Sequence, residues 1–185
     1  EISRFKDQAA PFMVVLHADE KAAVEAGREV LAEKGGTLIR LLNNSERHVS
    51  FRYEGKMYRV DPNRIFTVAG IRKNLQLLNT HYPESLVSRL YEFGQFVVKQ
   101  IPENEIIIAL HNNTEGDYSV RSYLDGGENR SDALQVLVNP ELDADDFYFV
   151  TTEELYRSLK RKNVNLVWQD NKGATDDGSL SVWCG

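Results

Sequence analysis

Two histidines and a glutamate are placed so that their side chains could bind one metal ion. His17 and Glu20 belong to the segment His17-Ala18-Asp19-Glu20, and His111 directly follows an apolar run that ends at Leu110. A histidine nitrogen and a carboxylate three residues apart, on a turn between a strand and a helix, can reach the same Zn²⁺. A catalytic zinc site takes three protein ligands and keeps a fourth position open. The pattern predicts a zinc site with His17, Glu20 and His111 as ligands, although either histidine alone fits a structural residue at a strand end.

A second short motif, Asp61-Pro62-Asn63-Arg64, offers groups that recognise a carboxylate. Asp61-Pro62 is typical of a turn. After the turn, the amide of Asn63 and the planar guanidinium of Arg64 can donate several N–H groups to one carboxylate. The competing interpretation is a plain turn in which Arg64 forms a surface ion pair. We expect Asn63 and Arg64 to bind a substrate carboxylate.

Taken in order, three motifs resemble those of the zinc carboxypeptidase superfamily, which includes the succinylglutamate desuccinylases and aspartoacylases. They are His17-x-x-Glu20, Asp61-Pro62-Asn63-Arg64 and His111-Asn112-Asn113. The resemblance covers residues 12–124 and implies that His17, Glu20 and His111 bind zinc, while Asn63 and Arg64 hold the free carboxylate of the substrate. The short spacing before His111 resembles the deacylase branch, whereas the proline of the second motif resembles the peptidase branch.

The family also polarises the scissile carbonyl with an arginine upstream of the Asn-Arg pair. Arg47, Arg52 and Arg59 lie in that stretch. We prefer Arg52, because Arg59 adjoins the turn and Arg47 lies in a loop, although each of the three also fits a solvated charge of a hairpin. Tyr118 is expected to line the substrate pocket, and the alternation around it fits a core position equally well.

The general base of the family, a glutamate on a late strand, has no counterpart in Leu180-Ser181-Val182-Trp183. Other acidic residues fit other places better: the first turn of a helix for Glu153 and Glu154, a solvated loop for Asp176 and Asp177, and an exposed loop for Glu115. We therefore assign no general base. Because the chain ends on an apolar, strand-like segment, we expect native sequence to continue beyond Gly185 and to supply the glutamate.

The elements that must position these residues follow from the apolar patterning. Residues 12–16 and 105–110 are apolar runs without alternation, typical of strands buried on both faces, and they end directly before His17 and His111. Further strands are expected at 37–42, 48–53, 57–60, 118–124, 134–138, 147–150, 165–168 and 180–183, and helices at 20–34, 68–78, after Pro83 and at 151–162. This order predicts an α/β fold with a mixed, largely buried sheet flanked by helices. By resemblance, the fold is expected to be zinc-carboxypeptidase-like, with the last part of the domain outside the sequence.

Composition narrows the class of protein. The 185 residues are 42% hydrophobic and 27% charged, which suits a single domain, 1–185, with a real core. The net charge of -6 argues against nucleic-acid binding, and no apolar run approaches the roughly 18 residues of a membrane span. The single cysteine, Cys184, excludes an internal disulfide and a cysteine-rich zinc module. The start at Glu1 fits a removed export signal or a trimmed chain, so the compartment is left open.

These features together predict a zinc-dependent hydrolase that cleaves an amide or peptide bond next to a carboxylate-bearing group. The substrate would be a peptide or an N-acyl amino acid with a free carboxylate. Two alternatives stay open: a deacylase of N-acyl amino acids, and a non-catalytic domain that binds zinc and carboxylate-bearing peptides without a general base. The second is favoured if Gly185 is the true end of the chain.

Overall fold

The structure, a computed structural model, describes residues 1–5, 11–102, 105–112 and 118–185. These residues form a mixed α/β structure with several sheets and helices. The chain divides into two compact units. The first comprises residues 1–112 and 177–180, and the second comprises residues 113–176 and 181–185. The α/β class is confirmed, whereas the single domain over 1–185 stays a prediction.

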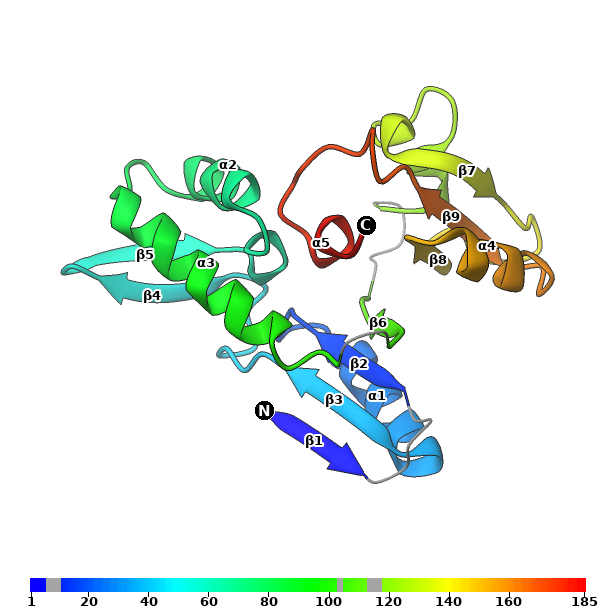
Figure 1. Cartoon of the computed structure of the whole chain (residues 1–185), viewed down its shortest axis with the longest axis horizontal. Coiled ribbons are helices and arrows are strands. Elements are labelled where there is room, and N and C mark those ends of the chain that lie inside the picture. Colours follow the sequence, from blue (N-terminus) through cyan, green and yellow to red (C-terminus); the bar gives the residue numbers. More distant parts are fainter. Residues whose placement is uncertain (6–10, 103–104, 113–117) are drawn as a thin grey trace. The chain divides into compact units, whose positions relative to one another are not determined.

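The first unit contains a four-stranded sheet in the order β1-β3-β2-β6 (Figure 1). Its strands are β1 (Ile2–Phe5), β2 (Phe12–Val15), β3 (Gly36–Arg40) and β6 (Ile107–Ala109). β2 pairs in parallel with β3 and β6, and β1 pairs antiparallel with β3. The sheet is therefore mixed, as predicted, but the sequence patterning did not indicate β1.

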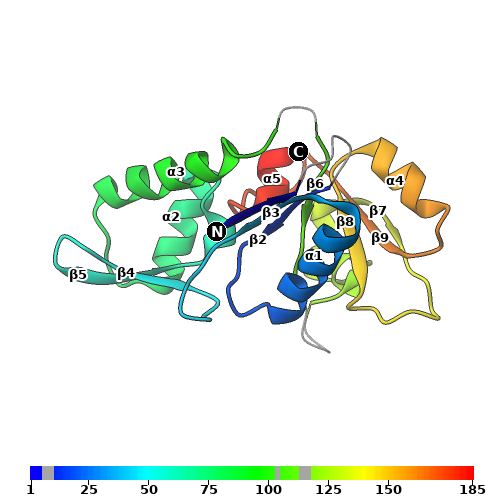
Figure 2. The same ribbon diagram turned by 90° about the horizontal axis from the view of Figure 1, so that it is seen from below.

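β2 is buried completely because the sheet is covered on both faces. Met13 and Val15 pack against α1 (Lys21–Lys34), which lies along one face of the sheet (Figure 2). Phe12 and Val14 point the other way, into the main core. β6 differs from the prediction, because it is a short strand at the edge of the sheet and its Ile108 is 40% exposed. The strand buried on both faces is thus confirmed at 12–16. A strand also forms within 105–110, but the prediction that it is buried is wrong.

A hairpin and two helices complete the main core. β4 (Val49–Tyr53) and β5 (Lys56–Val60) pair antiparallel, and α2 (Val68–Leu78) and α3 (Glu84–Val98) follow at the expected positions. Thr67 begins α2 by accepting a hydrogen bond from the Gly70 N–H. Gly94 lets α3 pass close to the loop after the Asn-Arg pair, since an added Cβ would lie 2.3 Å from the carbonyl oxygen of Ile65.

Residues 177–180 also belong to the first unit. Leu180 is 3% exposed and packs in the main core, and the Phe66 N–H donates to the carbonyl of Gly178 at 3.0 Å. Two glycines make this packing possible. A Cβ on Gly70 would lie 2.1 Å from the Cα of Gly178, and Gly178 itself has a φ of +78°. The segment therefore lies directly on the start of α2.

The second unit is built on a three-stranded sheet in the order β7-β9-β8. Its strands are β7 (Ala133–Leu137), β8 (Phe147–Val150) and β9 (Asn165–Gln169), and α4 (Glu153–Lys160) covers one face. The remaining elements are three short helices, η2 (Val120–Tyr123), η3 (Arg130–Asp132) and α5 (Leu180–Cys184), of which α5 begins in the first unit.

Two predicted strands are wrong. Residues 118–124 contain η2, because the Ser119 hydroxyl caps a turn by accepting from the Arg121 N–H. Residues 180–183 lie in α5. Residues 118–124 alternate between apolar and polar side chains, whereas residues 180–183 are mostly apolar. Segments this short fit a strand and a helical turn equally well.

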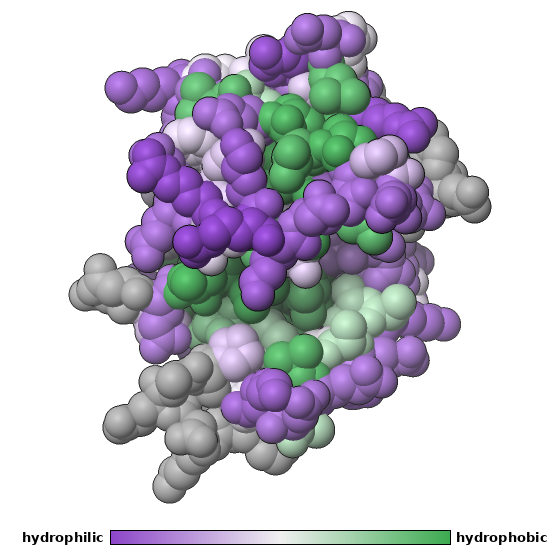
Figure 3. Space-filling model, turned by 90° about the vertical axis from the view of Figure 1, so that its right-hand side faces the viewer, coloured by the Kyte–Doolittle hydropathy of each residue, from purple (hydrophilic) through white to green (hydrophobic). Residues whose placement is uncertain are grey.

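Apolar side chains also reach the surface. Ile106, Ile108, Leu134 and Tyr148 are all at least 40% exposed. Figure 3 shows one face, on which green, apolar patches lie between hydrophilic side chains. In the described part of the chain, no helix combines the length and the apolar character needed to cross a membrane.

Candidate metal centre

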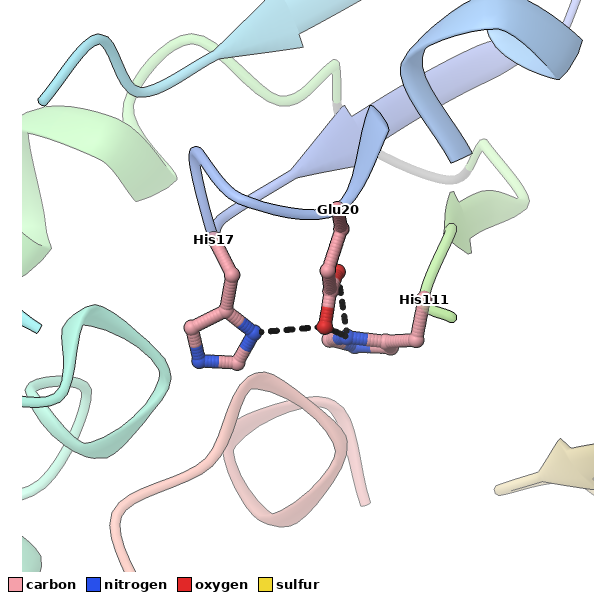
Figure 4. Close-up of side chains that lie close together, drawn as sticks. All are labelled: His17, Glu20 and His111. Carbon is pink, nitrogen blue, oxygen red and sulfur yellow. Dashed lines mark hydrogen bonds and ion pairs between the residues drawn. The ribbon is translucent and has the colours of Figure 1, made fainter. Parts of the chain in front are cut away.

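His17, Glu20 and His111 lie together in the first unit, after the carboxyl ends of β2 and β6 (Figure 4). One ligand atom from each lies within 4.8 Å of the others. The Nδ1 of His17 is 3.0 Å from a Glu20 oxygen, and the Nδ1 of His111 is 3.2 Å from the other. His17 and Glu20 are buried, whereas the His111 side chain is 33% exposed. The structure brings the three predicted ligands together in a cluster that is open on the His111 side.

Local hydrogen bonds explain this convergence. Glu20 occupies the N-cap position of α1, but its side chain makes no capping bond and turns instead toward the histidines. Asn112 takes over at the helix start: its Oδ1 accepts from the Ala23 N–H at 2.9 Å. This bond ties the residue after His111 to the helix that Glu20 begins. The bond therefore holds the segment of His111 next to the segment of Glu20.

Asp61 is a member of the site that the sequence patterns indicated only as a turn residue. The Nε2–H of His17 donates to Asp61 Oδ1 at 2.8 Å. The same oxygen accepts from the Asn63 N–H, and Asn74 of α2 hydrogen-bonds both the N–H and the carbonyl of Asp61. Asp61 is thus held by the turn and by α2, and it fixes the orientation of the His17 ring.

The cluster shifts the pKa values of its members. Burial opposes ionisation of Glu20, but hydrogen bonds from His111 and His17 prevail and lower its pKa from 4.5 to about 2. Burial likewise opposes ionisation of Asp61, yet the bond from His17 lowers its pKa from 3.8 to about 2. Burial alone would lower the pKa of His17, but Asp61 and Glu20 raise it above 6.5. Both carboxylates are therefore ionised at neutral pH, and their negative charges favour the protonated form of His17.

The donor set fits zinc. Two imidazole nitrogens and one carboxylate are typical zinc ligands, whereas calcium and magnesium favour oxygen ligands alone. When His17 Nε2–H donates to Asp61 in the neutral ring, Nδ1 carries a lone pair and faces Glu20 Oε1 at 3.0 Å. Two acceptors this close require a positive centre beside them, either a proton or a metal ion. The carboxylate behind His17 is also the common partner of a metal-binding histidine.

The structure does not bring Arg52 to the cluster. Its guanidinium donates to the carbonyl of Gly55 near the tip of the hairpin, and its strand partner is Met57. That pair lies three positions from the Val49–Val60 pair beside Asp61, or about 10 Å along the strand.

The two other arginines are better placed than Arg52. Arg59 donates to the Nδ1 of His48 at 3.0 Å, and Arg47 Nη1 lies 3.4 Å from Glu20 Oε1. Of the three candidates that the sequence offered, Arg47 is thus the one with a contact to a predicted ligand. Position along the chain favours Arg52, but the loop that carries Arg47 places this side chain against Glu20.

Asn63 and Arg64 lie side by side in and after the predicted turn, which forms η1 (Pro62–Arg64). Both contact the 177–180 segment: Asn63 Oδ1 accepts from the Leu180 N–H at 3.1 Å, and Arg64 Nη1 donates to Asp177 Oδ2 at 2.9 Å. The ion pair of Arg64 that the sequence left open as an alternative is therefore present. Asp177, expected to be a solvated loop acid, is its partner.

The remaining predicted residues lie elsewhere. Tyr118 belongs to the second unit, where its hydroxyl bonds that of Tyr123 and its ring packs edge-on against Phe147. Its role in a substrate pocket stays a prediction. Asn113 and Glu115 lie outside the described residues.

Comparisons with protein-family models, curated proteins and solved structures found no match to this chain. The function is consequently inferred from the residues and their geometry.

Proposed function

We propose that this chain is a zinc-dependent hydrolase of the zinc carboxypeptidase type, which cleaves an amide or peptide bond next to a carboxylate-bearing group. The observation that carries the proposal is the convergence of His17, Glu20 and His111, with Asp61 behind His17. Residues far apart in the sequence meet with the donor types that zinc prefers, and one side of the cluster is open. A peptide and an N-acyl amino acid both meet the chemical requirement for a substrate.

Each residue has a defined part in this proposal. His17, Glu20 and His111 would hold the zinc ion. When bound, zinc would act as a Lewis acid that polarises a carbonyl group and activates water. Asp61 keeps the His17 ring oriented by accepting its Nε2–H. Arg47, next to Glu20, is the cation best placed to face a polarised carbonyl, and Arg64 would bind the carboxylate of the substrate.

The second candidate function is a non-catalytic domain that binds zinc and carboxylate-bearing ligands. It is supported by the contacts of the cluster: among the described residues, the carboxylates hydrogen-bonded to its histidines are Glu20 and Asp61, and each is already held by a ring nitrogen. A metal site without a positioned base loses roughly 10²–10⁴ in rate. The two candidates share the metal centre and differ in turnover alone.

Zinc content tests the metal centre that both functions need. We expect close to one zinc ion per chain in protein purified without chelator, and loss of most of this zinc in His111→Ala. His81→Ala is the matched control, because His81 is an exposed histidine on the loop before α3. A wild-type protein without zinc, or equal zinc contents in the two variants, would contradict the proposal.

Turnover separates the two functions. Chelator-sensitive hydrolysis of an N-acyl amino acid or a short peptide by the zinc-loaded chain would support the enzyme. Zinc binding without hydrolysis would favour the binding domain.

A further inference from the structure

The Arg64–Asp177 ion pair belongs to the site that is proposed to bind a carboxylate. Asp177 uses both carboxylate oxygens: Oδ2 accepts from Arg64 Nη1 at 2.9 Å, and Oδ1 accepts from the Ser179 N–H at 2.9 Å. The backbone behind it is fixed, because Leu180 is buried in the core and Gly178 packs on Gly70. Asp177 is therefore not a loop side chain that a ligand can easily move aside.

The same pair is accessible to a ligand. The Arg64 side chain is 35% exposed and that of Asp177 is 33% exposed. Arg64 Nη1 is already used, since it donates to Asp177 and to the carbonyl of Asn63. A guanidinium has five N–H donors, so its other edge can still hold a carboxylate. A ligand carboxylate bound there has a negative charge as its neighbour.

The charge of Asp177 affects which ligands can bind at Arg64. A ligand that carries only a carboxylate places two negative charges beside one guanidinium, and like charges in contact disfavour binding. A ligand that also carries an ammonium group on the next carbon pairs its carboxylate with Arg64 and its ammonium with Asp177. Both groups can reach the pair, because the interacting atoms of Arg64 and Asp177 are only 2.9 Å apart.

We infer that Asp177 makes the Arg64 site selective for the zwitterionic end of an amino acid over a plain carboxylate. The inference rests on the proposed function and narrows its substrate class. An ordinary peptide C-terminus lacks the free ammonium, because its α-nitrogen is part of a peptide bond. Of the two proposed substrate classes, the inference therefore keeps the N-acyl amino acids, and among these the ones acylated on a side-chain nitrogen, whose own ammonium and carboxylate are free.

Two small probes differ only in the ammonium group: 2-aminohexanoate and hexanoate. Their affinities for the full chain are measured by NMR titration at pH 7 and low salt, where exposed charges are screened least. Asp177→Asn removes the charge and keeps an oxygen that can accept from the Ser179 N–H. Asp176→Asn is the matched control, since it removes the same charge one residue away. Arg64→Gln tests the carboxylate site itself.

We expect wild type and Asp176→Asn to bind 2-aminohexanoate about fivefold more tightly than hexanoate, the size of one partly exposed charge pair. Asp177→Asn should erase this preference, and Arg64→Gln should weaken both ligands. Equal affinities in wild type, or a preference that survives in Asp177→Asn, would overturn the role of Asp177 alone if Arg64→Gln still weakens binding. Unchanged binding in Arg64→Gln, or no binding of either probe to wild type, would overturn carboxylate recognition by Arg64 as well.

Discussion

Asp61→Asn is the most informative single substitution, because it alters the proposed metal centre without removing a predicted ligand. The amide oxygen of the substituted side chain can still accept from His17 Nε2–H and from the Asn63 N–H, so the turn and the ring position are retained. The change removes only the negative charge behind the ring. We therefore expect a folded protein with weaker zinc binding.

The size of the effect follows from two quantities. The folded protein lowers the pKa of Asp61 from 3.8 to about 2, which corresponds to about 2.5 kcal/mol in favour of the ionised form. The Asp61 side chain is only 15% exposed, so solvent screens little of this. Because the neutral bond to His17 remains, we take about 2.5 kcal/mol as the upper limit for the loss of stability of the metal-free protein. Removing such a partner of a metal-binding histidine typically costs roughly 10–100-fold in metal affinity.

Zinc affinity is measured by competition with a chromophoric chelator, and stability by urea unfolding of the metal-free protein. Asp19→Asn is the control, because Asp19 is an exposed acid between His17 and Glu20 and its loss changes the net charge equally. We expect the Asp61 variant to bind zinc at least tenfold more weakly than the Asp19 variant. Equal zinc affinities would refute the idea that Asp61 orients His17 for a metal.

Two further predictions concern stability. Since the folded protein lowers the pKa of Glu20 from 4.5 to about 2, its carboxylate contributes stability fully above pH 4.5. This contribution is lost as the pH falls toward 2, so the urea midpoint of metal-free wild type should drop over that window more than that of Glu20→Gln. Gly178→Ala should destabilise the protein by more than about 2 kcal/mol, because φ is +78° and the new Cβ would lie 2.7 Å from the Arg64 carbonyl oxygen. Gly55→Ala is the control, because Gly55 has a φ of +80° but open space around an added Cβ, and it should lower the free energy of unfolding by about half as much. Equal unfolding midpoints of the two variants would mean that the 177–180 segment does not pack as described.

The sequence alone determined much of the first unit and the positions of the three clustered residues. The hairpin, α2 and α3 were predictable because their signals are local: an apolar periodicity in the helices and a turn at Glu54-Gly55 between the two strands. The doubly buried β2 was equally predictable from its uninterrupted apolar run. The positions of the two histidines followed from the same elements, because His17 and His111 come just after strands that pair in parallel.

Only the tertiary structure decided which partners these residues have. Asp61 lies 44 residues from His17, and Asn63 lies 117 residues from the backbone of Leu180 that it contacts. No spacing rule connects such positions, since they meet only after α2 and the 177–180 segment have packed together. The choice of Arg47 over Arg52 depends in the same way on the path of one loop. The helix at Leu180–Cys184 was also beyond the sequence, because five apolar-rich residues fit two periodicities, and burial of Leu180 in a distant core decides between them.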